Sequence, residues 1–352
     1  MGKQPAGQAA GQRETAERAS GADEQAFGEL TGPYRRELLV HCYRMLGSLT
    51  DAEDMLQETL LAAWRGLDGL RAEVALRPWL YRIATSRCLN SLRAGRRRVP
   101  AEPVPPFQPP EPTRRGEITW LQPYPDGWLE DIADSAPGPE ARYQATEAVT
   151  LAFITALQRM PPRQAAALLL RDVLGFSAAE AAAMLGTSPT AVKGIVQRAR
   201  ASLARQRMGE EQARPGPAAE RDLAARFARA YIAGDVDGVV ALLTDDAWLS
   251  MPPAPHEYQG REAIAAFLRA SFGYRGGREL LLLPARANGQ PAFGSYLRGP
   301  GEAGAVPAGL IVLTSGADGI RALTRFHAEQ LYPRFGLPVT WSGPGVREKL
   351  AL

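Results

Sequence analysis

Two clusters of proline constrain the fold of this chain more than any other feature of its sequence. Seven prolines fall within residues 100–112, and two more fall within residues 208–217. Because proline lacks a backbone N–H and fixes φ, no continuous helix can pass through either cluster. We therefore predict three structured parts and two connectors. The structured parts are residues 23–98, 142–207 and 218–340, and the connectors are residues 99–141 and 208–217. Residues 1–22 are rich in Gly, Ala, Gln and charged side chains and are expected to be disordered.

The first structured part contains an amphipathic helix predicted over residues 51–64, with Thr50 or Asp51 as its N-cap and acidic residues in its first turn. One face carries apolar and small residues at helical spacing and is expected to be core. These residues are Ala52, Met55, Leu56, Thr59, Leu60 and Ala63. The other face carries Asp51, Asp54, Gln57, Glu58 and Leu61. For an isolated helix, the simplest reading of such a face is a solvated charged surface.

An arginine-rich stretch follows this helix. Nine arginines fall within residues 65–98, against Asp68 and Glu73. Such a stretch has the charge needed to bind nucleic-acid phosphates. A helix predicted over residues 77–93 leaves Arg82, Asn90 and Arg93 projecting outward. Trp79 and Tyr81 lie beside these arginines and suit the stacking of unpaired bases, although Trp79 fits a core position equally well.

The second structured part reads as four helices that end in a helix-turn-helix. A helix over residues 149–160 is followed by one over 161–175, then by one that Ser177 caps with Glu180 in capping-box spacing. A turn at Gly186 and Thr187 precedes the last helix. The last helix turns Val192, Val196, Ala199 and Leu203 inward. Its outer face carries Ser188, Thr190, Ala191, Lys193, Gln197, Arg198 and Arg200, which are able to meet base edges and phosphates. Any helical hairpin imitates this pattern, so the pattern alone is a weak signal.

The third structured part is predicted to be α+β, with helices first and a meander of strands after them. Asp318 and Gly319 form the last hairpin turn, and Arg325 and His327 then project from one side of the same strand. Together with His256 and Asp246, which we place in loops, they make a general base conceivable. No paired carboxylates and no triad order support catalysis, so we assign no catalytic residue and expect a regulatory role.

The order of these elements closely resembles a known family. The succession PYRRELLVHCYRMLGSLTDAEDMLQETLLAAW and then RPWLYRIATSRCLNSLR resembles region 2 of sigma-70 family initiation factors of the extracytoplasmic-function (ECF) group. Residues 142–207 resemble sigma region 4. The run from YIAGDVDG to REAIAAFL resembles the SnoaL-like cone found at the C-terminus of one ECF subgroup. The resemblance implies two all-α domains, a region 2 bundle and a region 4 helix-turn-helix, followed by an α+β SnoaL-like domain with a pocket.

The resemblance also implies partners and roles. The factor would bind the β′ clamp helices and the β flap of core RNA polymerase, recognise promoter DNA and open it, with the connector at 99–141 threading the polymerase cleft. The implied polymerase-binding residues are Asp51, Asp54, Gln57, Glu58 and Leu61. The implied minus 10 residues are Arg77, Trp79, Tyr81, Arg82, Asn90 and Arg93. The implied minus 35 residues are Arg171, Ser188, Thr190, Ala191, Lys193, Gln197 and Arg198. Packing of the acidic, aromatic connector on this protein's own domains remains an equal alternative.

One position departs from the family pattern. Many members carry Ser then Arg after the Val-Lys of the recognition helix, whereas this chain has Gly194 and Ile195. A basic contact is lost, and a glycine within a helix costs about 1 kcal/mol. Minus 35 binding is therefore expected to be weaker or differently specific.

The remaining features exclude other classes of protein. A formal net charge of +3 is too small for a globally basic nucleic-acid coat, so the basicity is regional. No run is long and apolar enough to span a membrane or serve as a signal peptide, so we expect a cytoplasmic protein. Cys42 and Cys88 are expected to be ordinary buried thiols, and no metal or cofactor is expected. The alternatives are a free-standing helix-turn-helix regulator and a SnoaL-like enzyme. Small-ligand binding or intramolecular contacts by the C-terminal domain remain open.

Overall fold

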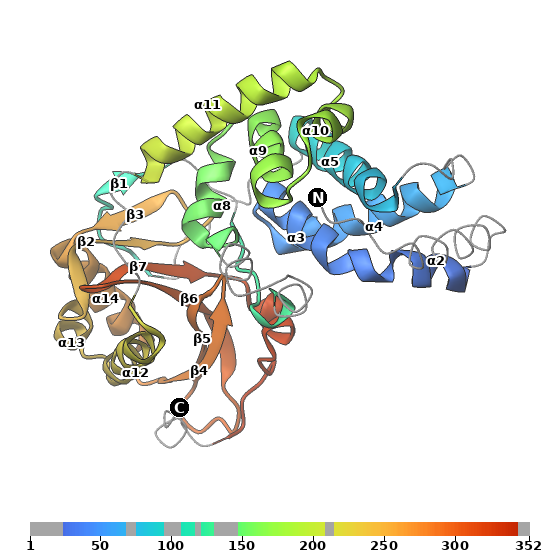
Figure 1. The fold of residues 1–352 in the computed structure, drawn as a ribbon. Helices are drawn as coiled ribbons and strands as arrows, with labels where there is room; N and C mark the ends of the chain where they lie inside the picture. Colours follow the sequence, from blue (N-terminus) through green and yellow to red (C-terminus); the bar gives the residue numbers. More distant parts are fainter. Residues whose placement is uncertain are drawn as a thin grey trace. The chain divides into compact units, whose positions relative to one another are not determined.

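The structure is a computed structural model that describes residues 24–67, 75–94, 107–116, 121–129, 147–207 and 215–343. Residues 1–22, which the sequence predicts to be disordered, lie outside this part of the chain. The described residues divide into two compact units, each considered by itself (Figure 1). The helical unit comprises residues 24–67, 75–94, 147–148 and 152–206. The sheet unit comprises residues 107–116, 121–129, 149–151, 207 and 215–343.

The helical unit begins with a bundle of amphipathic helices. These are α2 (Glu24–Thr31), the single turn η1 (Gly32–Tyr34), α3 (Arg35–Leu46), α4 (Leu49–Gly66) and α5 (Leu76–Arg93). Gly47 ends α3 in the left-handed conformation, with φ 72°, and so permits the sharp turn into α4. The apolar stripes of α3, α4 and α5 meet in a core that includes the free thiols of Cys42 and Cys88, both buried as predicted.

The N-terminus of α4 differs from the prediction. The cap is Ser48, not Thr50 or Asp51, and its side chain accepts a hydrogen bond from the backbone N–H of Asp51 at 3.1 Å. The extra turn carries Leu49 into the core, where it is fully buried. Burial of this leucine favours the earlier start.

The helical unit continues with the segment that the sequence predicts as a helix-turn-helix. Its helices are α8 (Leu151–Gln158), α9 (Pro162–Leu168), α10 (Ala178–Leu185) and α11 (Pro189–Arg207), with a wider π-helical turn, η3 (Leu169–Val173), after α9. The single helix predicted over residues 161–175 is therefore interrupted. In η3 the N–H of Leu174 reaches back to the carbonyl of Leu169, at 2.9 Å.

The caps around α10 follow the sequence signals closely. Ser177 and Glu180 form the predicted capping box, and the hydrogen bond from Ser177 lowers the pKa of Glu180. Gly186 ends α10 with φ 60°, and the hydroxyl of Ser188 then accepts from Ala191 N–H. These caps fix the turn that orients α11.

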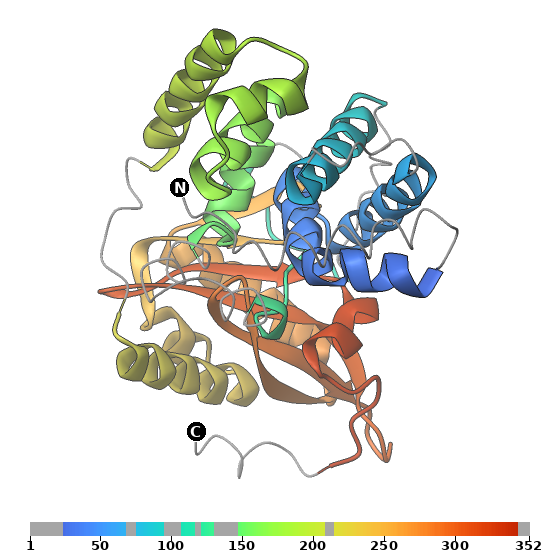
Figure 2. The same ribbon diagram turned by 45° about the vertical axis from the view of Figure 1, so that its right-hand side comes forward.

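The sheet unit is the predicted α+β domain, built on a mixed seven-stranded sheet (Figures 1 and 2). The strand order is β1-β3-β2-β7-β6-β5-β4, and only β2 and β7 pair in parallel. The strands are β1 (Arg114–Arg115), β2 (Leu243–Ser250), β3 (His256–Gln259), β4 (Glu279–Ala287), β5 (Gln290–Arg298), β6 (Val306–Gly316) and β7 (Gly319–Phe326). The helical elements are α12 (Pro217–Ala233), α13 (Val236–Val240), α14 (Arg261–Arg275) and η4 (Glu329–Phe335). The first three of these helices gather on one face of the curved sheet.

The core of the sheet unit lies between those helices and the sheet. Phe227 of α12 stacks on Tyr231, with ring centroids 5.2 Å apart, and faces Phe293 of β5 at 6.1 Å. Phe267 of α14 packs on Tyr258 of β3 at 4.9 Å. Among the described helices, none combines the length and apolarity needed to cross a bilayer.

Gly194 and Gly186 provide a matched pair for testing backbone conformation. A Cβ at Gly194, within α11, would meet nothing closer than a guanidinium nitrogen of Arg198 at 3.7 Å. Gly194→Ala should therefore raise the free energy of unfolding by about 1 kcal/mol. Gly186→Ala has open space, but its φ is left-handed, so it should lower that free energy by about 1–2 kcal/mol. Urea denaturation measures both changes, and shifts of the same sign would contradict the argument.

Candidate polymerase and promoter interfaces

The outer face of α4 offers both charge and apolar surface. Asp54, Gln57 and Leu61 are exposed, and Leu61 keeps 55% of its surface in solvent although it is apolar. Asp51 and Glu58 are half-buried at the edges of the same face. The opposite face is buried at Ala52, Met55, Thr59 and Ala63 as predicted, so the exposed residues are free of any role in the core.

The outward face of α5 carries three of the predicted DNA-binding residues. Arg82, Asn90 and Arg93 are exposed, and Arg93 donates a hydrogen bond to the side-chain oxygen of Asn90 at 2.9 Å. Trp79 is half-buried, with its ring at the C-terminal end of α4, where a Cβ on Gly66 would lie 3.4 Å from it. Because Trp79 is only half-buried, the structure does not decide between the core position and the base-stacking role that the sequence left open.

Tyr81 and Arg77 point inward, and this corrects the expectation that Tyr81 lies free beside the arginines. Tyr81 is fully buried, and its hydroxyl donates to Glu37 at 3.1 Å. Arg77 donates to the same carboxylate at 3.1 Å, and both side chains pack on Phe176, which precedes α10. Burial and the charge of Glu37 raise the pKa of Tyr81. The spacing of Tyr81 with Thr85 and Cys88 on one helical stripe is the signal that could have revealed its burial.

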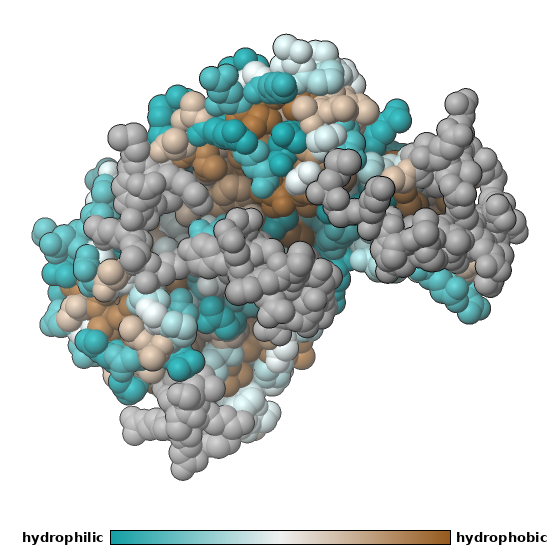
Figure 3. All heavy atoms as spheres, viewed as in Figure 1, coloured by the Kyte–Doolittle hydropathy of each residue, from teal (hydrophilic) through white to brown (hydrophobic). Residues whose placement is uncertain are grey.

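The exposed face of α11 gathers most of the predicted minus 35 residues. Thr190, Lys193, Gln197 and Arg198 are exposed, Ser188 caps the helix and Ala191 is half-buried. The inward residues Val192, Val196 and Ala199 are buried as predicted. In Figure 3 many hydrophilic side chains lie over α11, at the top of that view.

Two further arginines of this part of the helical unit are engaged by neighbouring groups. Arg171 donates a hydrogen bond to the backbone carbonyl of Phe176. Arg200 forms two hydrogen bonds with the carboxylate of Asp172, at 2.7 and 2.8 Å. A bidentate pair of this kind orients Arg200 toward η3.

The connector between the two helical parts contributes to the sheet unit. In its described residues, β1 adds to the edge of the sheet beside β3. Tyr258 donates to the carbonyl of Pro110 at 2.9 Å. The hydroxyl of Thr113 donates to the carbonyl of Glu257 and accepts from the N–H of Gln259. Of the two alternatives for the connector, these contacts support packing on the protein's own domain.

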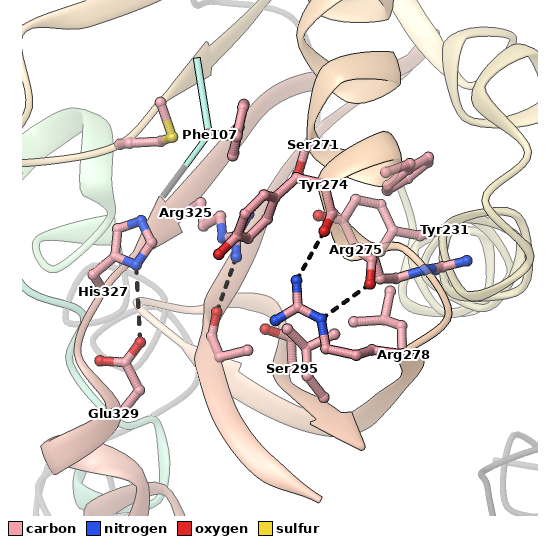
Figure 4. A pocket seen from close by; sticks show the side chains of 15 residues that line it. Phe107, Tyr231, Ser271, Tyr274, Arg275, Arg278, Ser295, Arg325, His327 and Glu329 are labelled. Atoms are coloured by element: carbon pink, nitrogen blue, oxygen red, sulfur yellow. Dashed lines mark hydrogen bonds and ion pairs between the residues drawn. The ribbon is translucent and has the colours of Figure 1, made fainter. Parts of the chain in front are cut away.

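The sheet unit also contains a cavity of about 250 Å³ (Figure 4). Arg325 and His327 both line it, although His327 lies one residue beyond the end of β7 and not on the strand as predicted. His256 and Asp246 do not line it, and they lie in β3 and β2 and not in loops. Of the two histidines considered as a general base, only His327 lines the cavity, and its Nδ1 lies 3.8 Å from Oε1 of Glu329.

Comparison with known proteins identifies the family. Family models match sigma-70 region 2 at residues 30–98, sigma-70 region 4 at 150–203 and a SnoaL-like domain at 224–303. The chain is 42% identical over 326 residues to the ECF RNA polymerase sigma factor SigG of Mycobacterium tuberculosis, covering 90% of this chain and 86% of SigG. The chain belongs to the ECF RNA polymerase sigma factors.

This sigma factor is also similar to SigJ of Mycobacterium tuberculosis. It is 30% identical to SigJ over 300 residues, which cover 82% of each chain. The crystal structure of SigJ superposes with a TM-score of 0.58 at 25% identity, covering 89% of this chain and 99% of SigJ. Regions 2 and 4 followed by a SnoaL-like domain are thus the architecture of this sigma factor. The family is not enzymatic, so the SnoaL-like enzyme alternative is set aside.

His41 of α3 is fully buried in region 2, where its side chain contacts α5. One ring nitrogen is 2.9 Å from the hydroxyl of Thr85, and the ring packs against Tyr81 with centroids 5.1 Å apart. Burial, together with the charges of Arg44 and Arg77, lowers the pKa of His41 to about 3. No cluster of metal-binding side chains occurs among the described residues.

The lowered pKa of His41 makes the stability of this sigma factor depend on pH. The unfolded chain binds a proton at His41 below its ordinary pKa of 6.5, whereas the folded chain resists protonation down to about pH 3. The contribution of His41 to the free energy of unfolding is therefore fully present above pH 6.5, and it falls by about 1.4 kcal/mol per pH unit as the pH decreases from 6.5 toward 3. His41→Gln keeps a hydrogen-bonding side chain but does not titrate, so its urea-denaturation free energies should fall less steeply. Parallel pH curves for the two proteins would rule out His41 as the cause.

Proposed function

We propose that this ECF sigma factor divides its work among three surfaces. The outer face of α4 binds the clamp helices of the polymerase β′ subunit. The outward face of α5 contacts the minus 10 element, and α11 contacts the minus 35 element while region 4 engages the β flap. A protein that acts on polymerase in this way works in the cytoplasm.

The observation that carries the polymerase assignment is the two-sided character of α4. Its buried face accounts for the fold, which leaves Asp54, Gln57 and Leu61 without a structural task. An exposed leucine among acidic residues suits a docking surface, because the charges steer the encounter and the apolar group is desolvated on binding.

The promoter assignment rests on the predicted DNA-binding side chains that are exposed on α5 and α11. Arg82, Asn90 and Arg93 on α5 and Lys193, Gln197 and Arg198 on α11 are exposed and therefore accessible to DNA. Arg77 and Tyr81 meet DNA only after they separate from Glu37 and Phe176. We therefore assign the present contact of α5 with the turn before α10 to a resting arrangement of regions 2 and 4.

The SnoaL-like domain modulates the factor through the connector. Because β1 and its hydrogen bonds to Glu257, Tyr258 and Gln259 hold residues 107–116 on the sheet, the connector is unavailable to the polymerase cleft while docked. Polymerase and the sheet then compete for one segment. Polymerase shifts the population from docked to released connector only as far as it binds the factor more tightly with the connector released than with it docked.

Charge reversal at Asp54 tests the polymerase surface. Asp54→Arg should weaken binding to core RNA polymerase by at least about tenfold, because it replaces an attractive charge by a repulsive one. Affinity is measured by fluorescence anisotropy of the labelled factor, and circular dichroism checks the fold. Glu24→Arg, an equal charge reversal at an exposed position of α2, is the matched control. Equal affinities for the two variants would remove α4 from the interface.

Weakening the docked connector tests the modulation. Thr113→Val with Tyr258→Phe removes three hydrogen bonds between the connector and the sheet, each worth about 1 kcal/mol. The docked fraction should fall, and promoter-specific transcription in vitro should rise at equal core occupancy. Thr244→Val, which removes a hydroxyl bonded to Asp246 on the same sheet, should leave transcription unchanged. Unaltered output from the double variant would show that docking does not restrain the factor.

A further inference from the structure

The cavity of the sheet unit is lined by residues from both the helices and the sheet of this domain. Its lining residues come from α12, from the C-terminal end of α14, from β4 to β7 and from the connector. Its volume of about 250 Å³ approaches the lower end of the range for small-molecule sites. The cavity therefore has room for a compact molecule and not for a peptide.

One part of the wall is apolar and largely aromatic. Phe107 of the connector lies with its ring centroid 5.8 Å from that of Tyr274. Tyr231 and Phe272 meet edge to face at 5.0 Å. Met251, Leu280 and Leu297 complete the apolar lining. Ring faces and edges of this kind favour a flat, apolar ligand body.

The polar part of the wall is cationic. Figure 4 shows the guanidinium groups of Arg278 and Arg325 near the ring of Tyr274, and Arg278 lies 4.9 Å from the centroid of that ring. Arg278 donates to the carbonyls of Arg275 and Tyr274, and Arg325 donates to that of Ala308 at 3.0 Å. A guanidinium has five N–H donors, so both side chains keep donors for a ligand.

Arg325 gives the clearest indication of a missing acceptor. Its Nε is buried and has no hydrogen-bond partner among the described residues. A buried donor left unpaired costs about 1–3 kcal/mol, which a ligand oxygen would recover. Arg275, which also lines the cavity, likewise has a buried Nε without a partner among the described residues, and its guanidinium donates to the carbonyl of Ile232 at the end of α12.

The charge around the cavity does not balance. Three arginines line it, whereas Glu329 is its single carboxylate, and His327 lies 3.8 Å from that carboxylate. Burial alone would raise the pKa of Glu329, but the hydrogen bond with His327 and the charges of His327 and Arg325 lower it. Glu329 is thus ionised near neutral pH, and the cavity still carries excess positive charge. An anion is the complement of that excess.

We propose that this cavity binds a small aromatic carboxylate, with its ring system against Phe107, Tyr231 and Phe272 and its carboxylate between Arg278 and Arg325. Planar guanidinium groups match a carboxylate through paired N–H donors, whereas a neutral amide of the same shape offers one oxygen and no charge. The site is thus selective for charge as well as for shape. This binding activity goes beyond the initiation function and does not depend on it.

The test is isothermal titration calorimetry of the full chain with 2-naphthoate and with its neutral isostere 2-naphthamide. Naphthoate should bind with 1:1 stoichiometry and at least about tenfold more tightly than naphthamide. Arg278→Gln and Arg325→Gln should each abolish this preference, and Arg325→Lys should restore part of it. Arg261→Gln, on the same domain but paired with Asp245 outside the cavity, should retain the preference in full.

Three outcomes would overturn the proposal. They are equal affinity for the two compounds, no saturable binding of naphthoate up to about 1 mM, and an unchanged preference in both cavity variants. Thermal unfolding of each variant separates loss of the site from loss of the fold. Arg325→Gln removes the hydrogen bond to the carbonyl of Ala308, so a folded variant should have a melting temperature only slightly below that of the original protein. A folded variant that has lost naphthoate selectivity supports the assignment.

Discussion

The carboxylate of Glu37 is the interaction on which the helical unit depends. It lies between α3 and α5 and is only 23% exposed, so its ionised form needs partners. Arg77 and Tyr81, one turn apart on α5, supply them. Their pairing fixes the rotation of α5 about its axis, and this rotation decides that Arg82, Asn90 and Arg93 face outward. The same two side chains contact Phe176, so the contact between regions 2 and 4 depends on one half-buried carboxylate.

The sheet unit depends on a comparable polar anchor at the turn between β4 and β5. Asn288 is buried with φ 57°, and its side chain accepts from the N–H of Tyr124 at 2.8 Å and donates to the carbonyl of Val149 at 2.6 Å. Asp126 accepts from Gly289 N–H and from Arg286 in the same place. The connector is therefore held at two sites, here and at β1, and its apolar side chains gain a buried environment. A segment that is rich in proline becomes part of a domain because its neighbours supply the hydrogen bonds that it cannot make within itself.

Local rules predicted the parts of this sigma factor that local interactions control. Helical periodicity identified the buried and exposed faces of α4 and of α11, and cap chemistry identified Ser177, Glu180 and Gly186. The same rules failed where a residue distant in the sequence provides a contact that local patterns do not reveal. Tyr81 was expected beside DNA because arginines surround it, yet Glu37 and Phe176 give it better partners within the protein. Ser48 replaced Thr50 or Asp51 as the cap because Leu49 gains burial.

The sequence by itself determined the helical character of regions 2 and 4, the helix-turn-helix and the α+β class of the C-terminal domain. These follow from periodicity, proline placement and caps, whose energetics involve residues a few positions apart. Only the tertiary structure decided that the connector adds strand β1 to the sheet and that Tyr81 is buried. It also decided that Arg278 and Arg325 converge on one cavity with Phe107. These contacts join residues far apart in the chain, and their free energy comes from burial and pairing that no local pattern records.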